Sequence, residues 1–309
     1  MLRALAASAS TLNLLRALAQ GGFADLHEVH RWTTDFARRS PQGERFEEMA
    51  DRISEALAFM EACGFGSATL PQLSEVEHFT SHEALLLEYE EALSRPDEAT
   101  GGWYAGSAHM LWLGERTRVL DGAHVEYLRG IENSIGVKIG PTASADEVAR
   151  LADVLDPDNI AGKLVLITRK GAGNLPRRLP ELARAMRRAG RDIVWCCDPM
   201  HGNTVVNASG YKTRDFSSIL TEIREFFAVH SAEGTHAGGL HFEMTGQDVT
   251  ECRGGAQQLT DQALAARYLT ACDPRLNGSQ SLEVAFMVAE LLKPRRPSQN
   301  SMSPTHPAC

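Results

Sequence analysis

The sequence predicts an α/β protein built on a parallel sheet, with a helical region ahead of it. From about residue 107 onward, short apolar runs alternate with segments of helical periodicity, an order typical of parallel strands joined by helical crossovers. Several of these runs end at polar, turn-forming residues, as strands do at the carboxyl edge of a parallel sheet. The first hundred residues instead carry helical periodicity.

We expect the amino-terminal region, 1–100, to consist of helices. A third helix should begin after Ser40-Pro41 and end at Gly64, because its apolar residues fall on one stripe. Thr80 and Glu83 have the spacing of a capping box, which predicts a fourth helix over TSHEALLLEYEEAL. The stretch RPDEATGG is predicted to be a linker. The first two helices are expected over residues 11–20 and about 25–38.

The second region, 101–293, contains six strand-like runs, and the tail 294–309 is rich in Pro and Ser and is expected to be disordered. The runs are HMLWLG (109–114), IGVKIG (135–140), KLVLITR (163–169), RDIVWCC (191–197), GGLHFEM (238–244) and, more weakly, YLTAC (268–272). Helices are expected over 122–130, 144–155, 179–189, 216–233, 260–267 and 281–292.

Composition excludes several classes of protein. A net charge of −9 argues against a general nucleic-acid binder. No apolar run reaches the roughly 20 residues of a membrane span, which argues against a membrane protein. The six cysteines lack zinc-finger spacing, and we expect reduced thiols in a cytoplasmic protein. The opening MLRALAASAS weakly mimics a signal peptide, but its Leu and Ala spacing indicates an amphipathic helix.

Three polar residues follow successive predicted strands. His201 lies in IVWCCDPMHGNT, Glu243 in GGLHFEMTG and Asp273 in YLTACDPRLNG. One imidazole and two carboxylates are a plausible set of divalent-metal ligands. The alternative for each residue is an ordinary hydrogen-bonded side chain at a strand end.

Three cations also lie near the ends of predicted strands. Arg116, Lys138 and Arg169 would converge on the same rim of an acidic protein, which suggests an anionic substrate because Arg and Lys suit phosphate and carboxylate groups. The alternative for each is a solvated surface charge.

The segments that carry these residues resemble a known family. CDPMHGNT, GGLHFEMTGQDVTEC and CDPRLNGSQSLEVAF are similar to signature segments of class II 3-deoxy-D-arabino-heptulosonate 7-phosphate (DAHP) synthase, the first enzyme of the shikimate pathway. LGERTR and GVKIGP extend the resemblance upstream, and it runs to about Lys293. It implies a TIM-type (β/α)8 barrel, of which this chain would supply six of eight strands. The family's amino-terminal portion, with a Gly-Asp-Cys-Ala-Glu segment that provides a fourth, cysteine ligand, does not appear in the sequence.

The resemblance implies an aldol-type condensation of phosphoenolpyruvate with erythrose 4-phosphate, releasing phosphate. His201, Glu243 and Asp273 would hold a divalent metal, Mn²⁺ in first place and Co²⁺ as the alternative, which polarises the aldehyde. The resemblance also implies a homo-oligomer, and it assigns phosphoenolpyruvate to Glu115, Arg116, Lys138 and Arg169. The sequence identifies no proton donor, and Lys212 and Arg214 are equally consistent with a sugar-phosphate contact or a solvated loop.

The sequence departs from the family pattern at two places, and two alternative functions remain open. Arg169-Lys170-Gly171 stands where the family usually has Arg-Met-Gly, and Asn133-Ser134 where it commonly has Asn-Pro. One alternative is a paralogue in secondary metabolism that makes DAHP or its amino analogue. The other is a truncated, inactive phosphoenolpyruvate-binding or partner protein. We also expect an incomplete barrel with open edges at HMLWLG and at the last strand, and hence a fragment or a start assigned too late, unless a partner chain covers the edges.

Overall fold

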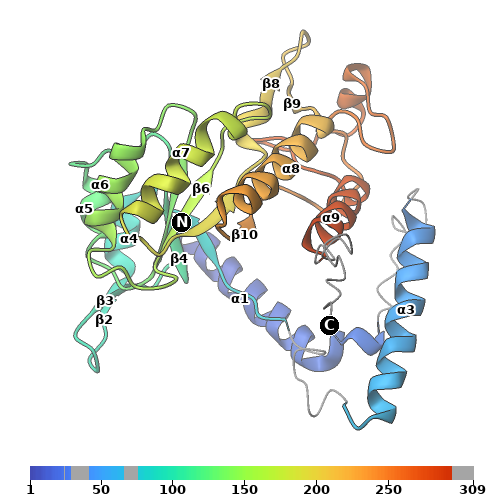
Figure 1. Ribbon diagram of the computed structural model, residues 1–309, viewed down its shortest axis with the longest axis horizontal. Helices are drawn as coiled ribbons and strands as arrows, with labels where there is room; N and C mark the ends of the chain where they lie inside the picture. The colour runs from blue at the N-terminus through green and yellow to red at the C-terminus, as the bar shows by residue number, and fades with distance from the viewer. Residues whose placement is uncertain (24, 29–41, 66–75, 294–309) are drawn as a thin grey trace, which may run out of the picture.

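The computed structural model describes residues 1–23, 25–28, 42–65 and 76–293 (Figure 1). Most of the predicted second helix, 25–38, and the predicted disordered tail, 294–309, lie outside these residues. None of the described helices is both long enough and apolar enough to cross a membrane.

A six-stranded sheet organises the molecule, and all of its neighbouring strands are parallel. This confirms the predicted α/β class and parallel sheet. The strand order is β1-β4-β5-β6-β7-β10. The strands are β1 (Ser81–Glu83), β4 (Met110–Leu113), β5 (Ser134–Ile139), β6 (Leu164–Thr168), β7 (Val194–Cys197) and β10 (Ala237–Leu240).

Helices follow the strands in alternation and cover the sheet (Figure 1). Ser144 caps α6 by accepting the Glu147 N–H. Asn277 forms a capping box with Gln280 at the start of α9. The helices are α5 (Ala123–Leu128), α6 (Ala145–Leu155), α7 (Leu175–Arg188), α8 (Phe216–Glu233) and α9 (Gly278–Leu292), with a 3₁₀ helix, η5 (Asp261–Ala266), where 260–267 was expected to be helical.

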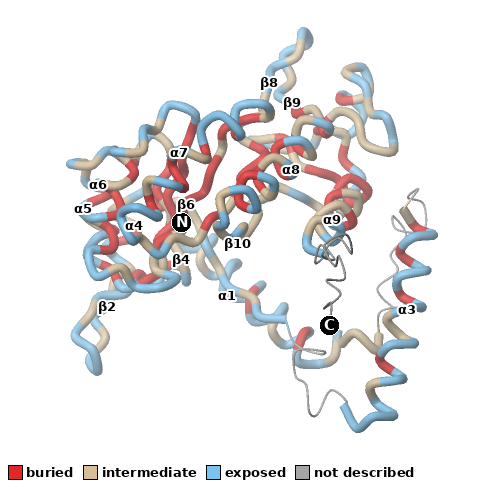
Figure 2. The backbone as a smooth tube through the Cα atoms, in the orientation of Figure 1, coloured by how far each residue is buried: buried red, intermediate tan, exposed pale blue. Residues whose placement is uncertain are grey.

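The main core lies between the sheet and these helices, where Figure 2 shows the buried backbone concentrated. Alternate strand residues supply it, among them Val137 and Ile139 of β5, both fully buried. Because side chains alternate across a strand, Lys138 projects to the opposite face of the sheet from these two residues. Its ammonium lies 5.6 Å from the ring centre of Trp112 on β4, which places a buried cation on the face that carries the candidate site.

Two of the sequence predictions about strands are wrong. Residues 81–83 were expected to belong to a helix, but β1 pairs in parallel with β4, so the edge of the sheet lies at β1 and not at HMLWLG. The fourth helix, α4, begins only at Leu87. Tyr268–Cys272 is not a strand, because the Leu269 and Thr270 N–H groups donate to the buried Glu251 carboxylate. The pairing next to β10 falls instead on Leu276, in a single parallel bridge with Met244.

The segment predicted as a linker, 95–102, forms the end of β2 (Ser94–Pro96) and the turn of an antiparallel hairpin with β3 (Trp103–Ala105). A second hairpin, β8 (Thr204–Val206) with β9 (Lys212–Arg214), follows His201. Of the amino-terminal helices, α1 (Leu2–Leu18) is largely exposed, with Leu12 its one buried residue (Figure 2). The predicted third helix is α3 (Gly43–Ala62), whose Phe46 and Ala50 pack on Phe286 of α9.

Candidate active site

The three predicted metal ligands lie together beyond the carboxyl ends of β7 and β10. One donor atom from each of His201, Glu243 and Asp273 falls within 4.8 Å of the other two. His201 Nε2 lies 3.6 Å from Glu243 Oε1 and 4.0 Å from Asp273 Oδ2. Residues separated by up to 72 positions along the chain (201 to 273) therefore converge on one small volume.

The loop after β7 positions His201 through Asp198. The Asp198 Oδ1 atom accepts the Met200 and His201 N–H groups at 3.0 and 3.1 Å, which fixes the turn between the strand and the histidine. Its Oδ2 atom accepts the His201 Nδ1–H at 2.7 Å. Because an ionised carboxylate can only accept, Nδ1 carries a proton, and Nε2 is the ring nitrogen that faces Glu243 and Asp273.

Asp198 is ionised although it is fully buried. Burial opposes its charge, but the hydrogen bond from His201 and the charge of Lys138 outweigh it and lower the pKa of Asp198. Lys138 Nζ lies 2.5 Å from Asp198 Oδ2. The predicted anion-binding lysine is thus joined to the predicted metal ligand by one shared carboxylate.

The β8–β9 hairpin brings two further cations to the candidate ligands. Lys212 Nζ lies 3.1 Å from Asp273 Oδ1, and Arg214 Nη1 lies 2.5 Å from Glu243 Oε2. Arg214 is fully buried, and its Nε donates to Thr204 Oγ1. The solvated-loop alternative is therefore wrong for Arg214, whereas Lys212 is half-exposed.

The donor set fits a divalent cation. It combines one imidazole nitrogen, oriented by a carboxylate as metal-binding histidines usually are, with two carboxylate oxygens. Nitrogen and oxygen ligands of this kind suit Mn²⁺, Co²⁺ and Zn²⁺ alike. Within the described residues, no cysteine joins the group, and burial raises the pKa of Cys196 and of Cys252 to about 12, which leaves both as thiols.

The predicted anion-binding residues come from three adjacent strands. Arg116 follows β4, Lys138 belongs to β5 and Arg169 follows β6. In the described part of the chain, the Arg116 and Arg169 guanidinium groups have no carboxylate within salt-bridge distance and no side-chain hydrogen bond, so both are open to a ligand. The Glu115 carboxylate, by contrast, is already hydrogen-bonded within the chain. It accepts the Gly140 N–H at 2.6 Å and a hydrogen bond from Arg118 at 2.9 Å.

Lys170, a departure from the family pattern, is buried behind these loops. Its ammonium donates to the Gly140 carbonyl, while Glu115 accepts the N–H of the same glycine. Burial lowers the pKa of Lys170 to about 8. Lys170 therefore helps to hold the loop after β5, which follows Lys138.

Sequence reasoning missed Asp198, Asn203 and Glu222 as supports of the site. For Asp198 the signal was its position three residues before His201 in the same turn-forming segment. Glu222 is fully buried on α8, among Phe216, Ile219, Ile223 and Phe226. A glutamate within that apolar stripe was a detectable signal, because a buried carboxylate needs partners. Burial raises its pKa to about 7, against hydrogen bonds from Gly171, Lys170 and Asn203 that lower it.

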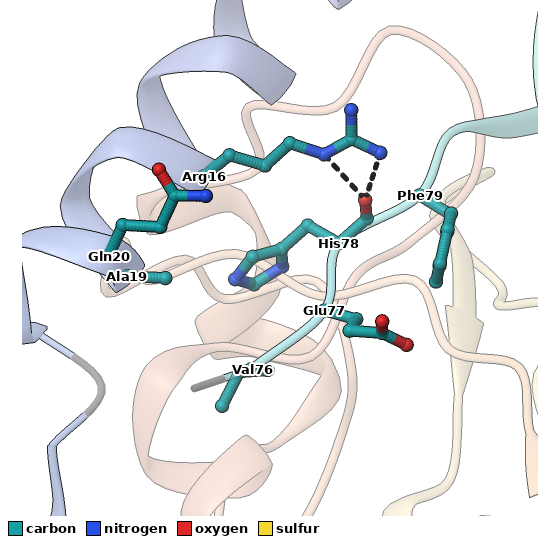
Figure 3. Close-up of a pocket in the computed structure, with 7 residues that line it drawn as sticks. All are labelled: Arg16, Ala19, Gln20, Val76, Glu77, His78 and Phe79. Atoms are coloured by element: carbon teal, nitrogen blue, oxygen red, sulfur yellow. Dashed lines mark hydrogen bonds between the residues drawn. The ribbon is translucent and has the colours of Figure 1, made fainter. Parts of the chain in front are cut away.

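A separate pocket lies between the end of α1 and the segment before β1 (Figure 3). Arg16 crosses it and donates from Nε and Nη2 to the His78 carbonyl at 3.2 and 2.9 Å. None of the predicted site residues lines this pocket. Its one cation is occupied by a backbone carbonyl, so we assign it a structural role in joining α1 to the sheet.

Comparison with known proteins places this geometry in a family. The chain is 52% identical over 287 residues to a phospho-2-dehydro-3-deoxyheptonate aldolase of Streptomyces coelicolor, which covers 93% of this chain and 63% of that protein. It is 50% identical over 298 residues to the phospho-2-dehydro-3-deoxyheptonate aldolase AroG of Mycolicibacterium smegmatis, covering 95% of this chain and 64% of that protein. The chain thus spans a little under two thirds of the length of these relatives. The model of the class-II DAHP synthetase family matches residues 1–289, and the chain therefore belongs to that family.

Proposed function

We propose that this chain carries the active site of a DAHP synthase, which condenses phosphoenolpyruvate with erythrose 4-phosphate to form DAHP and phosphate. The observation that carries this proposal is the convergence of His201, Glu243 and Asp273 within 4.8 Å. At the same edge of the sheet, Arg116 follows β4 and Arg169 follows β6, on either side of β5, and neither has a carboxylate partner among the described residues. A cation site next to open arginines suits a reaction between a phosphorylated enol carboxylate and an aldehyde.

The roles of the residues follow from their surroundings. Arg116, Arg169 and Lys138 would bind the phosphate and carboxylate of phosphoenolpyruvate and orient its C3 atom toward the aldehyde carbon. Glu115 holds the Gly140 peptide, so its role is to shape the loop beside the substrate. A divalent cation held by His201, Glu243 and Asp273, which we infer to be Mn²⁺ with Co²⁺ as the alternative, would supply Lewis acidity at the aldehyde oxygen.

Asp198 is the residue that makes the histidine suitable for this role. It keeps the His201 proton on Nδ1 and neutralises Lys138 in a buried setting. Water would add at C2 of the enol phosphate as the new carbon–carbon bond forms, and phosphate would leave. We assign no residue as the proton donor to the new alkoxide.

We further propose that the parallel sheet is part of a (β/α)8 barrel, formed by residues 101–293 with β1 contributed by the region 1–100 that packs on it. The single bridge between Met244 and Leu276 extends the strand order beyond β10 in the direction that closure requires. We infer a cytoplasmic homo-oligomer that uses small phosphorylated substrates and binds neither nucleic acid nor membrane.

Phosphate release by the 309-residue chain tests the proposal directly. The purified protein is freed of metal with a chelator and supplied with Mn²⁺, phosphoenolpyruvate and erythrose 4-phosphate. Metal-dependent phosphate release, lost in His201→Ala, supports the synthase. Turnover only with an amino-substituted sugar phosphate would favour a secondary-metabolic paralogue. Binding of phosphoenolpyruvate by calorimetry without any turnover would favour a binding or partner protein.

A further inference from the structure

A single buried carboxylate connects the two loops that carry the candidate anion-binding and metal-binding residues. Glu222 projects from α8, and its Oε1 atom accepts the Lys170 and Gly171 N–H groups, each at 2.9 Å. These two residues directly follow Arg169 in the loop after β6. Its Oε2 atom accepts Asn203 Nδ2–H at 2.7 Å, in the loop after β7 that carries His201.

Asn203 completes the connection from the other side. Its Nδ2 group also donates to the Pro199 carbonyl at 2.8 Å, within its own loop. Its Oδ1 atom accepts the Ala172 N–H at 3.0 Å, back in the loop after β6. Glu222 and Asn203 therefore satisfy three consecutive backbone N–H groups, 170–172, while holding the turn that ends at His201.

The two loops also touch directly, which leaves them little independent freedom. A β-carbon added at Gly202 would lie 2.5 Å from the Gly171 nitrogen, and one added at Gly171 would lie 2.9 Å from the Gly202 carbonyl oxygen. Gly171 has a φ of +81°, a conformation that other residues rarely adopt. The loops can approach this closely only because both positions lack a side chain.

We propose that Glu222 is a positioning residue that fixes Arg169 relative to His201, so that an anion bound at one loop and a cation bound at the other meet in a set geometry. The proposal rests on the proposed function. It adds that the two half-sites are coupled through one carboxylate, which touches neither ligand. A displacement of about 1 Å between reacting partners can lower a rate by roughly 100-fold, so loss of this carboxylate should affect turnover more than it affects either binding step alone.

Glu222→Gln is the first variant, with Glu225→Gln as its matched control. Glu225 lies one turn along α8 and accepts the Gly173 N–H in the same loop, but it has no hydrogen bond to the His201 loop. In Glu222→Gln the amide oxygen can keep the Lys170 and Gly171 N–H groups, but the new NH₂ then faces the Asn203 NH₂. We expect kcat to fall at least tenfold in Glu222→Gln and to stay within twofold of wild type in Glu225→Gln.

The double variant Glu222→Gln/Asn203→Asp tests the coupling itself. It turns the facing pair into an amide donor and a carboxylate acceptor, and the second oxygen of residue 203 can still accept the Ala172 N–H. Asn203→Asp alone would place two carboxylates 2.7 Å apart in place of the present bond, so it should be as damaging as Glu222→Gln. The aspartate restores the bond to residue 222 but loses the donation to the Pro199 carbonyl, so we expect partial recovery, with kcat at least threefold above that of either single variant. Recovery in the double variant decides the question even if either single variant fails to fold, and no recovery overturns the proposal.

Amide hydrogen exchange separates a failure of this proposal from a failure of the proposed function. Mn²⁺ added to the wild type should slow exchange at Lys170 and Gly171 at least threefold, because ordering His201 also orders Asn203 and Glu222. The same addition should have no such effect in Glu222→Gln and should keep it in Glu225→Gln. Protection without turnover in the wild type would uphold the coupling and reject the synthase. Turnover without protection, or protection that persists in Glu222→Gln, would overturn the coupling alone.

Discussion

Lys138 and His201 share one oxygen atom of Asp198: Lys138 Nζ lies 2.5 Å and His201 Nδ1 lies 2.7 Å from Oδ2. A lysine of β5 and a histidine of the loop after β7 thereby meet at a single buried charge. Any change at Asp198 must act on the predicted anion-binding residue and the predicted metal ligand together.

Asp198→Asn should weaken Mn²⁺ binding by about 10- to 100-fold, the usual effect of removing the carboxylate that orients a metal-binding histidine. The amide would also leave Lys138 without its counter-charge, so binding of phosphoenolpyruvate should change in the same variant. Calorimetric titration of the metal-free protein measures both. Asp192→Asn, an exposed change just before the opposite end of β7, should bind Mn²⁺ like the wild type; equal affinity in the two variants would reject the role of Asp198.

Glu243→Gln should abolish metal-dependent turnover, lowering kcat at least 100-fold, while the circular dichroism spectrum stays unchanged. Glutamine is preferred to alanine because it keeps a polar oxygen beside Arg214, which is fully buried, whereas removing one partner of a buried pair outright commonly costs about 3–5 kcal/mol. His201→Ala should lose turnover equally without that cost. Wild-type rates in either variant, after chelator treatment and return of Mn²⁺, would show that the ligand assignment is wrong.

Lys212→Gln should tighten Mn²⁺ binding by a few-fold. The lysine ammonium occupies Asp273 Oδ1 at 3.1 Å, so it competes with a cation for the charge of that carboxylate. Water and salt screen exposed ion pairs, so the gain in affinity should not exceed about fivefold. Lys293→Gln, which removes an exposed pair with Glu290 on α9, is the control. Weaker Mn²⁺ binding by Lys212→Gln would instead indicate that Lys212 supports the metal-bound arrangement.

His230 should make the fold sensitive to acid. Burial lowers the pKa of this α8 histidine from an ordinary 6.5 to about 4, so the folded chain keeps it neutral while the unfolded chain takes up a proton below pH 6.5. The free energy of unfolding is therefore unaffected by this histidine above pH 6.5 and decreases as the pH falls from 6.5 toward 4. At about 1.4 kcal/mol per pH unit, the total decrease is about 3 kcal/mol.

Urea unfolding of the wild type and of His230→Phe at pH 7 and pH 4 measures this contribution. Phenylalanine suits the site because the His230 ring packs against Phe226, with ring centres 4.4 Å apart. The loss of unfolding free energy between the two pH values should be about 3 kcal/mol smaller in the variant. His236→Gln, an exposed change nearby, should leave most of the acid sensitivity in place. The same pH dependence in wild type and His230→Phe would assign the sensitivity to other groups.

Much of the sheet could be predicted because its signals are local. An apolar run such as KLVLITR can be recognised without knowledge of its neighbours, and five of the six predicted runs overlap strands of the sheet. The meeting of His201 and Glu243 was also predictable from the order of the segments, whereas Asp273 reaches the site although the described structure has no strand at 268–272. Parallel strands deliver their carboxyl ends to one edge, so residues that follow successive strands gather there whatever their separation in the chain.

The errors arose where a distant partner decided the local structure. Ser81–Glu83 has helix-like sequence context, but pairing with Met110–Trp112 holds it as a strand. Tyr268–Cys272 has strand-like composition, but the carboxylate of Glu251 takes the N–H groups that a neighbouring strand would need. Intrinsic propensities differ by less than about 1 kcal/mol per residue, so a few tertiary hydrogen bonds are enough to override them.

The sequence by itself determined the class of fold, the edge of the sheet at which the site lies, and the chemical character of its side chains. Only the tertiary structure decided which of those side chains are already paired with other residues of the chain and which are available to bind a ligand. Arg214 is paired with Glu243, whereas Arg116 and Arg169, which are also arginines, have no carboxylate partner in the part of the chain that the structure describes. Hydrogen bonding and charge pairing depend on distances of about 3 Å between residues far apart in sequence, and those distances exist only once the strands, helices and loops have packed together.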